Sequence, residues 1–156
     1  KLINELTKLS GLKGMVGGQQ MDLEAEKKRL QIKDIRLLQQ LKTGELFRFS
    51  CVASSILAQN EKKYYEILEK FSINLGLAFQ IKDDLLDIEG KEENVGKKVN
   101  KDFSKGKQTF ISNYGVEKAR RKAENLIDEA IDLINNFSKK DDVLENIVRL
   151  IINRSS

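Results

Sequence analysis

The chain has 156 residues, a formal net charge of +4 from 28 basic and 24 acidic side chains, no His, no Pro, no Trp and a single Cys. These counts exclude a disulfide framework, a histidine-ligated metal centre and a nucleophile activated by histidine. Basic and acidic residues interleave along the chain, which is typical of a solvated helix surface and argues against nucleic acid as a partner.

The length fits one domain, and a hydrophobic content of 40% is sufficient for a packed core. No apolar run approaches the roughly 20 residues of a membrane-spanning helix, and the first residues lack the apolar centre of a secretory signal. We therefore predict a cytoplasmic protein without membrane insertion, in which Cys51 is reduced and packed.

The composition predicts an all-α chain, because Leu, Ile, Lys, Glu, Gln and Ala lose little on entering a helix and proline is absent. In chain order, we predict helices over residues 1–10, 11–23, 33–59, 62–89, 107–114, 116–137 and 141–153. The second contains several glycines and therefore requires close packing partners. With no heptad pattern and no internal repeat, the chain is predicted to be one helical unit.

Three further glycines mark predicted irregularities. Gly44 lies in the middle of the helix over 33–59 and is expected to let it kink. Gly90 is expected to end the next helix, before a polar loop over 91–106. Gly115 is expected to break the chain between the short helix before it and the last two helices.

The segment over residues 73–90 is predicted to be an apolar helix that carries several acidic residues on one side. On a helix that advances about 100° per residue, five positions share one sector: Gly76, Gln80, Asp83, Asp84 and Asp87. The carboxylates are therefore expected to converge, and their mutual repulsion calls for a cation. Mg²⁺ suits carboxylate and phosphate oxygens, and Mn²⁺ is the alternative ion. For this acid pattern by itself, the competing interpretation is a solvated stripe paired with lysines.

Several segments together resemble one known family: GMVGGQQMDL (14–23), LKTGELFR (41–48), GLAFQIKDDLLDIEG (76–90), VGK with KDFSKGKQTF (95–110) and YGVEKARRKAENLIDEA (114–130). In this order and at this spacing they resemble the trans-isoprenyl diphosphate synthases of the bacterial farnesyl and geranyl type. FQ-x-x-DD-x-x-D is similar to the family's second aspartate-rich motif. The resemblance covers essentially the whole chain and corresponds to the C-terminal half of a synthase.

This resemblance implies an antiparallel helical bundle of the isoprenoid synthase type, with residues 1–156 as the C-terminal part of a single domain. It implies a Mg²⁺-dependent prenyltransferase whose substrates are isopentenyl diphosphate and an allylic diphosphate. The allylic diphosphate ionises to a carbocation, the double bond of isopentenyl diphosphate attacks, and a proton is lost. A short-chain product such as farnesyl diphosphate and a homodimer are also implied. The residues that set product length lie upstream of the matched part.

The resemblance also assigns roles to individual residues. Asp83 would bind Mg²⁺ directly, with Asp84 and Asp87 acting through coordinated water. Matching lysines would contact diphosphate: Lys42, Lys97 and Lys107. Thr43 and Gln80 would stabilise the carbocation with a hydroxyl and an amide oxygen. Gln19 and Asp22 match a helix that lines the same cavity.

The sequence departs from the family pattern at two positions and lacks other elements of it. Gln39 stands where the family often has His, and Ile111 stands where it usually has Pro. The family's first aspartate-rich motif, its arginine pair and its Gly-Lys-Arg segment have no counterpart, so the isolated 156 residues are expected to be inactive. The alternative is a non-catalytic helical subunit or interaction module, although the intact acid motif and lysines favour the enzyme.

Overall fold

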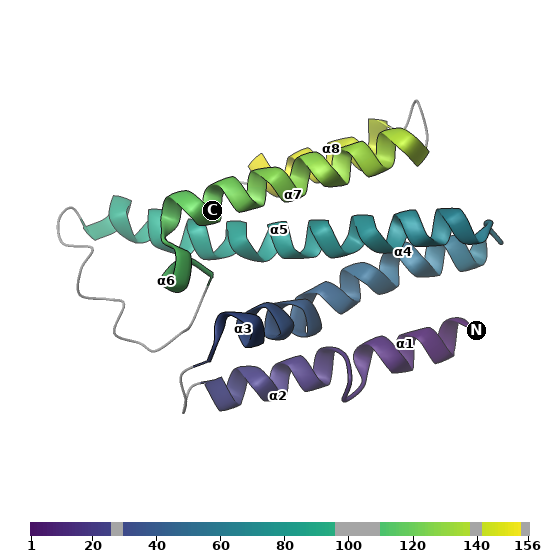
Figure 1. The fold of residues 1–156 in the computed structure, drawn as a ribbon, viewed down its shortest axis with the longest axis horizontal. Coiled ribbons are helices and arrows are strands. Elements are labelled where there is room, and N and C mark those ends of the chain that lie inside the picture. The colour runs from purple at the N-terminus through teal and green to yellow at the C-terminus, as the bar shows by residue number, and fades with distance from the viewer. Residues whose placement is uncertain (26–29, 96–109, 138–141, 154–156) are drawn as a thin grey trace.

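A computed structural model describes residues 1–25, 30–95, 110–137 and 142–153, which form a bundle of helices (Figure 1). In chain order the elements are α1 (Leu2–Ser10), α2 (Met15–Ala25), α3 (Ile32–Gln39), the π-helix η1 (Gln40–Gly44), α4 (Glu45–Leu57), α5 (Lys62–Val95), α6 (Phe110–Tyr114), α7 (Val116–Phe137) and α8 (Asp142–Asn153). The long elements run in alternating directions, and no strand occurs in these ranges (Figure 1). The predicted all-α, antiparallel architecture is confirmed.

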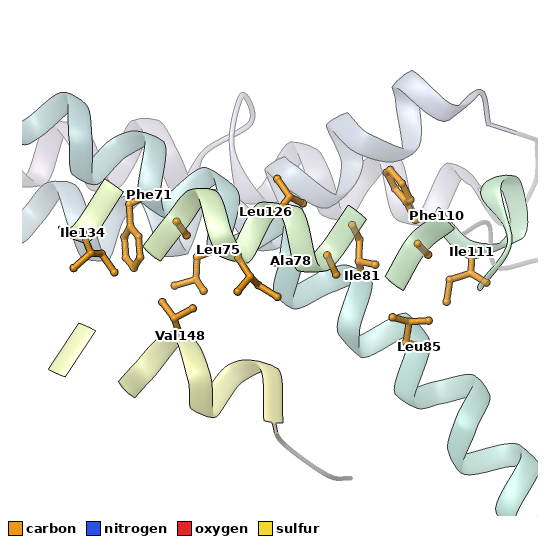
Figure 2. Close-up of a cluster of buried hydrophobic side chains, with 14 residues drawn as sticks. Phe71, Leu75, Ala78, Ile81, Leu85, Phe110, Ile111, Leu126, Ile134 and Val148 are labelled. Atoms are coloured by element: carbon orange, nitrogen blue, oxygen red, sulfur yellow. The ribbon is translucent and has the colours of Figure 1, made fainter. Parts of the chain in front are cut away.

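The core lies along α5, which packs against α4 on one side and α7 on the other (Figure 1). Buried positions of α7 recur at intervals of three and four residues, which places them on one stripe of the helix: Ala119, Ala123, Leu126, Ile127, Ala130 and Ile134. They meet Phe71, Leu75, Ala78, Ile81 and Leu85 of α5, and Val148 of α8 joins the same cluster (Figure 2). This cluster holds α5 as a rigid support for the side chains on its other face.

The helix predicted over residues 33–59 is three elements rather than one. A π-helix separates α3 from α4, and the Glu45 N–H donates to the carbonyl of Gln40, five residues back. The additional residue in this turn changes the phase between the two flanking helices by about 100°. Gly44 has ordinary right-handed dihedrals, φ −62° and ψ −34°. The irregularity predicted at this position is therefore a π turn and does not depend on the conformational freedom of glycine.

Other boundaries differ from the predicted ones by a few residues. Gly90 does not end α5, which continues to Val95. A glycine costs about 1 kcal/mol in a helix interior, and the Lys and Glu residues around it are good helix formers, so the helix propagates through it. Residues 11–14 form a turn between α1 and α2 instead of joining the second predicted helix. The predicted break at Gly115 is confirmed, because its φ is +79°.

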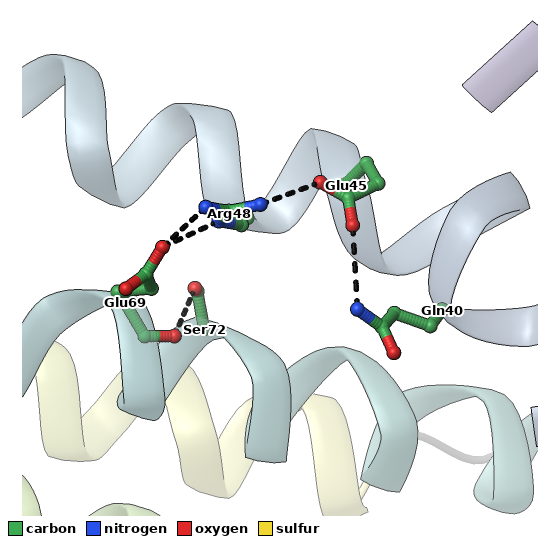
Figure 3. Close-up of polar contacts among 5 residues, drawn as sticks. All are labelled: Gln40, Glu45, Arg48, Glu69 and Ser72. Atoms are coloured by element: carbon green, nitrogen blue, oxygen red, sulfur yellow. Dashed lines mark hydrogen bonds and ion pairs between the residues drawn. The ribbon is translucent and has the colours of Figure 1, made fainter. Parts of the chain in front are cut away.

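A polar cluster braces α4 against α5 (Figure 3). Arg48 Nε donates to Glu69 Oε1 at 2.8 Å, and Arg48 Nη1 lies 3.3 Å from Glu45 Oε2. Gln40 Nε2 donates to the other Glu45 oxygen at 3.4 Å. Glu45 is only 4% exposed, so the Arg48 cation neutralises a carboxylate that solvent does not reach. The cluster ties Gln40 of η1 and the first turn of α4 to α5.

Within the described ranges, no helix combines the length and the apolarity that crossing a membrane would require.

Candidate functional site

The predicted site residues of the described part lie on α2, η1 and α5, and η1 packs against both of the other two helices. α2 carries Gln19 and Asp22, η1 carries Lys42 and Thr43, and α5 carries Gln80, Asp83, Asp84 and Asp87. Of the remaining candidates, Lys97 and Lys107 lie outside the described residues. Gln19 is exposed on α2.

The contact between α2 and η1 depends on Gly18. This glycine is buried, and a Cβ built on it would lie 2.3 Å from the backbone nitrogen of Lys42 and 2.7 Å from its Cα. No side chain can occupy this position without separating the two backbones. One turn further along α2, Asp22 reaches Lys42 and forms an ion pair with its ammonium group. The side chains of the pair are 28% and 34% exposed, so the pair is half-buried.

A second close approach brings η1 onto α5. A Cβ at Gly76 would lie 3.1 Å from the Cα of Gly44, which leaves no room for a side chain on α5 unless η1 shifts slightly. One helical turn beyond Gly76, the Thr43 hydroxyl donates to Gln80 Oε1 at 3.1 Å. The hydroxyl and amide that were predicted to act together are therefore in direct contact, although they are 37 residues apart in sequence.

The hydrogen bonding continues from Gln80 to Asp84. Gln80 Nε2 donates to Asp84 Oδ1 at 3.4 Å, and Gln39 Nε2 donates to Asp84 Oδ2 at 3.1 Å. Asp84 and Gln39 are each 6% exposed. Each oxygen of the Asp84 carboxylate thus accepts an amide N–H in a buried setting, while Gln39 Oε1 has no hydrogen-bond partner among the described residues.

The three acids of α5 do not converge as predicted. Asp84 is buried against α3, Asp83 is half-buried, and Asp87 is exposed. In the part of the chain that the structure describes, no three acidic or thiol side chains are grouped so that they could hold a metal ion. Asp83 and Asp87, one turn apart, leave the helix within about 40° of each other, whereas Asp84 lies at the other side of the shared sector and faces α3.

The donor set nevertheless fits one kind of metal site. Mg²⁺ is commonly held by one or two carboxylates, with waters and substrate phosphate oxygens completing its octahedron. Asp83 and Asp87 provide carboxylate oxygens on α5, about one and two turns beyond Gln80. The described residues therefore fit an ion shared with a phosphorylated ligand, and they do not form an all-protein cage.

Gln39 is the site residue whose contact was not predicted from the sequence. It falls on the buried face of α3, with Ile35 and Leu38 beside it, and an amide at a core position requires a hydrogen-bond partner. That requirement was the available signal. The identity of the partner depends on where α5 packs, because Asp84 is 45 residues further along the chain.

The chain is similar to known proteins over nearly its whole length. The polyprenyl synthetase family model matches residues 2–151. A farnesyl diphosphate synthase from Bacillus subtilis is 39% identical over 154 residues, which are 99% of this chain and 52% of that protein. The chain spans about half the length of the curated relatives that it matches.

Solved structures show the same fold. A FPP/GFPP synthase from Zymomonas mobilis superimposes with a TM-score of 0.83 at 41% identity, covering 96% of this chain and 49% of that one. A geranyltransferase from Helicobacter pylori, solved as a complex with magnesium and isoprenyl diphosphate, superimposes with a TM-score of 0.75 at 27% identity. It covers 97% of this chain and 50% of that one.

Proposed function

The chain belongs to the polyprenyl synthetase family, and from this premise we propose that it is the C-terminal half of a short-chain trans-prenyltransferase. The reaction would join isopentenyl diphosphate to an allylic diphosphate and give an isoprenyl diphosphate such as farnesyl diphosphate. The single observation that carries the proposal is the contact between Thr43 and Gln80, 3.1 Å apart and within one turn of Lys42 and Asp83. It supplies oxygen dipoles for a carbocation beside groups that suit diphosphate.

Separation of charge is the barrier in such a reaction, because the allylic substrate must become a cation and a departing diphosphate. Mg²⁺, or Mn²⁺, when bound would neutralise negative charge that grows on the diphosphate. We propose Asp83 as the residue that holds the ion directly, with Asp87 acting through its water molecules. Asp84, predicted to do the same, instead directs both of its oxygens to amide N–H groups and is 6% exposed. The ammonium group of Lys42 is proposed to bind diphosphate, and Lys97 and Lys107 are proposed to do the same.

Thr43 and Gln80 are proposed to stabilise the cation without trapping it. A hydroxyl oxygen and an amide oxygen present negative dipoles, and neither group is a strong nucleophile in its neutral form. The Thr43 hydroxyl donates its proton to Gln80 Oε1. The lone pairs of the Thr43 oxygen are therefore the part of the hydroxyl that is left to face a cation, which supports this role. Preorganised dipoles of this kind contribute several kcal/mol to catalysis in other enzymes.

The ion pair of Lys42 with Asp22 bears on substrate binding. Asp22 holds the lysine at the junction of α2 and η1, with its carboxylate in contact with the ammonium that a phosphate oxygen would otherwise contact. We propose that diphosphate competes with Asp22 for this lysine. We also propose that the protein forms a homodimer and is located in the cytoplasm. The isolated 156 residues are proposed to be inactive as a prenyltransferase.

The test uses the full-length protein that contains this chain. With Mg²⁺, radiolabelled isopentenyl diphosphate and an allylic diphosphate, chromatography should show a labelled short-chain product, and chelation of the metal should abolish it. Asp83→Ala should lower turnover by about 100-fold or more, the range seen when a charge-stabilising group is removed. Asp128→Ala, which removes an exposed acid of α7, is the matched control and should leave turnover unchanged. A wild-type protein that forms no product would contradict the proposal and favour an interaction module.

A further inference from the structure

We propose that Gln39 and Asp84 are positioning residues that fix the direction of a hydrogen-bond chain ending at Thr43. The chain runs from Gln39 to Asp84, from Asp84 to Gln80, and from Gln80 to Thr43, and it links α3, α5 and η1. This inference rests on the proposed function, because its purpose is to leave Thr43 with oxygen lone pairs rather than a free proton. No motif of the sequence assigned such a role to Gln39.

The direction of the chain follows from what each group can donate or accept. Both glutamines turn their NH₂ groups toward Asp84, whose two carboxylate oxygens accept. The nitrogen and oxygen of an amide lie on opposite sides, and Gln80 therefore turns its carbonyl oxygen toward Thr43. That oxygen must receive the proton of the Thr43 hydroxyl. Asp84 thus determines the polarity of Thr43 through Gln80, without contacting Thr43.

The orientation of Gln39 supports the same conclusion. Its amide is buried at 6% exposure, and its carbonyl oxygen has no partner among the described residues. Turning the amide over would place the carbonyl oxygen against the Asp84 carboxylate and would leave the NH₂ group unbonded. The donor side is therefore held against Asp84 at 3.1 Å, at the expense of an unsatisfied oxygen. A side chain retained only for packing would not need this polarity.

Burial makes the geometry specific. Both Asp84 and Gln39 are inaccessible to solvent, so water cannot replace a lost amide donor without opening the contact between α3 and α5. Gln80 and Thr43 are half-buried at the other end of the chain. A disturbance at Gln39 should therefore reach Thr43 as a changed orientation of the Gln80 amide, and it should affect turnover more than substrate binding.

The experiment exchanges the two partners in the full-length protein. Gln39→Glu sets two carboxylates against each other and removes the amide that donates to Asp84. The double variant Q39E/D84N restores a carboxylate facing an amide, and the carbonyl oxygen of the amide introduced at position 84 can still accept from Gln80. Gln31→Glu, an isosteric change at the exposed N-terminus of α3, is the matched control.

Q39E should lower kcat by about 100-fold, the size of effect expected from misplacing a catalytic group, with KM for isopentenyl diphosphate within about twofold of wild type. It should also lower the melting temperature measured without metal. The double variant should recover at least tenfold in kcat and most of the melting temperature, and the control should change neither.

Two outcomes would overturn the positioning role in an active enzyme: unchanged kcat in Q39E, or no recovery of kcat in the double variant. A wild-type protein that forms no product would instead overturn the proposed function, and with it any role in catalysis. The two failures are therefore distinguishable.

Discussion

Replacing Gly18 by Ala tests how α2 sets the position of Lys42. The added Cβ would lie 2.3 Å from the Lys42 nitrogen and 2.8 Å from the Leu41 carbonyl carbon, whereas ordinary contact begins at 3.4 Å. The obstructing atoms belong to the backbone, so no rotamer change can relieve the overlap. Helix α2 must move away from η1 by roughly 1 Å, because close-packed interiors offer no spare volume.

The magnitude follows from two opposing terms. Overpacking of a tight contact costs about 3 kcal/mol at the upper end of its usual range. Replacing a helical glycine by alanine returns about 1 kcal/mol. Gly18→Ala should therefore destabilise the protein by about 2 kcal/mol.

Gly44→Ala is the matched control. A Cβ at Gly44 meets nothing nearer than the Gln40 Cγ, at 3.7 Å, which is ordinary contact. The backbone is right-handed helical, so this change should be neutral or stabilising by up to about 1 kcal/mol. The measurement is urea unfolding of the full-length protein followed by circular dichroism. Calorimetry should also show that Gly18→Ala binds inorganic diphosphate more weakly, since Lys42 is displaced. If Gly18→Ala proves as stable as Gly44→Ala, the close approach is not as described.

Other predictions concern charged groups and the thiol. Asp22→Asn should tighten binding of inorganic diphosphate with Mg²⁺ several-fold, because it removes the anion that competes for Lys42. At most about 1 kcal/mol of stability should be lost, because the ion pair is partly exposed. Weaker binding in calorimetry would show that Asp22 instead holds the lysine for its ligand. Arg48→Leu should lower the free energy of unfolding in urea by about 1 to 3 kcal/mol, because Glu45 is left buried without its cation. A stability equal to that of wild type would refute the bracing role. Burial raises the pKa of the Cys51 thiol to about 11, so the stability this provides is complete below the unfolded pKa of about 8.5 to 9 and is lost as pH rises through 11. Wild type should thus lose more stability than Cys51→Ala between these pH values, and parallel curves would contradict the shift. The isolated 156-residue chain should form no labelled product, and measurable turnover would show that the upstream half is dispensable.

Much of the fold could be predicted from the sequence because helix formation is largely local. The spacing of apolar residues predicts α7 within its observed bounds, and Gly115 predicts the break before it. The family could also be predicted, since the acid motif, the KTG segment and their order are local patterns with specific spacing. Composition alone excluded disulfide and histidine chemistry.

Tertiary contacts decided the details that matter at the site. Helical phase predicts that the acids of α5 share a side, but the partner of Asp84 depends on α3, which packs close enough for Gln39 to bind it. The π turn at Gln40–Gly44 and the continuation of α5 past Gly90 likewise depend on packing and on flanking residues. A sequence pattern sets the angle at which a side chain leaves its own helix, whereas its hydrogen-bond partner and burial depend on which backbone lies opposite. Only the folded chain brings these groups together.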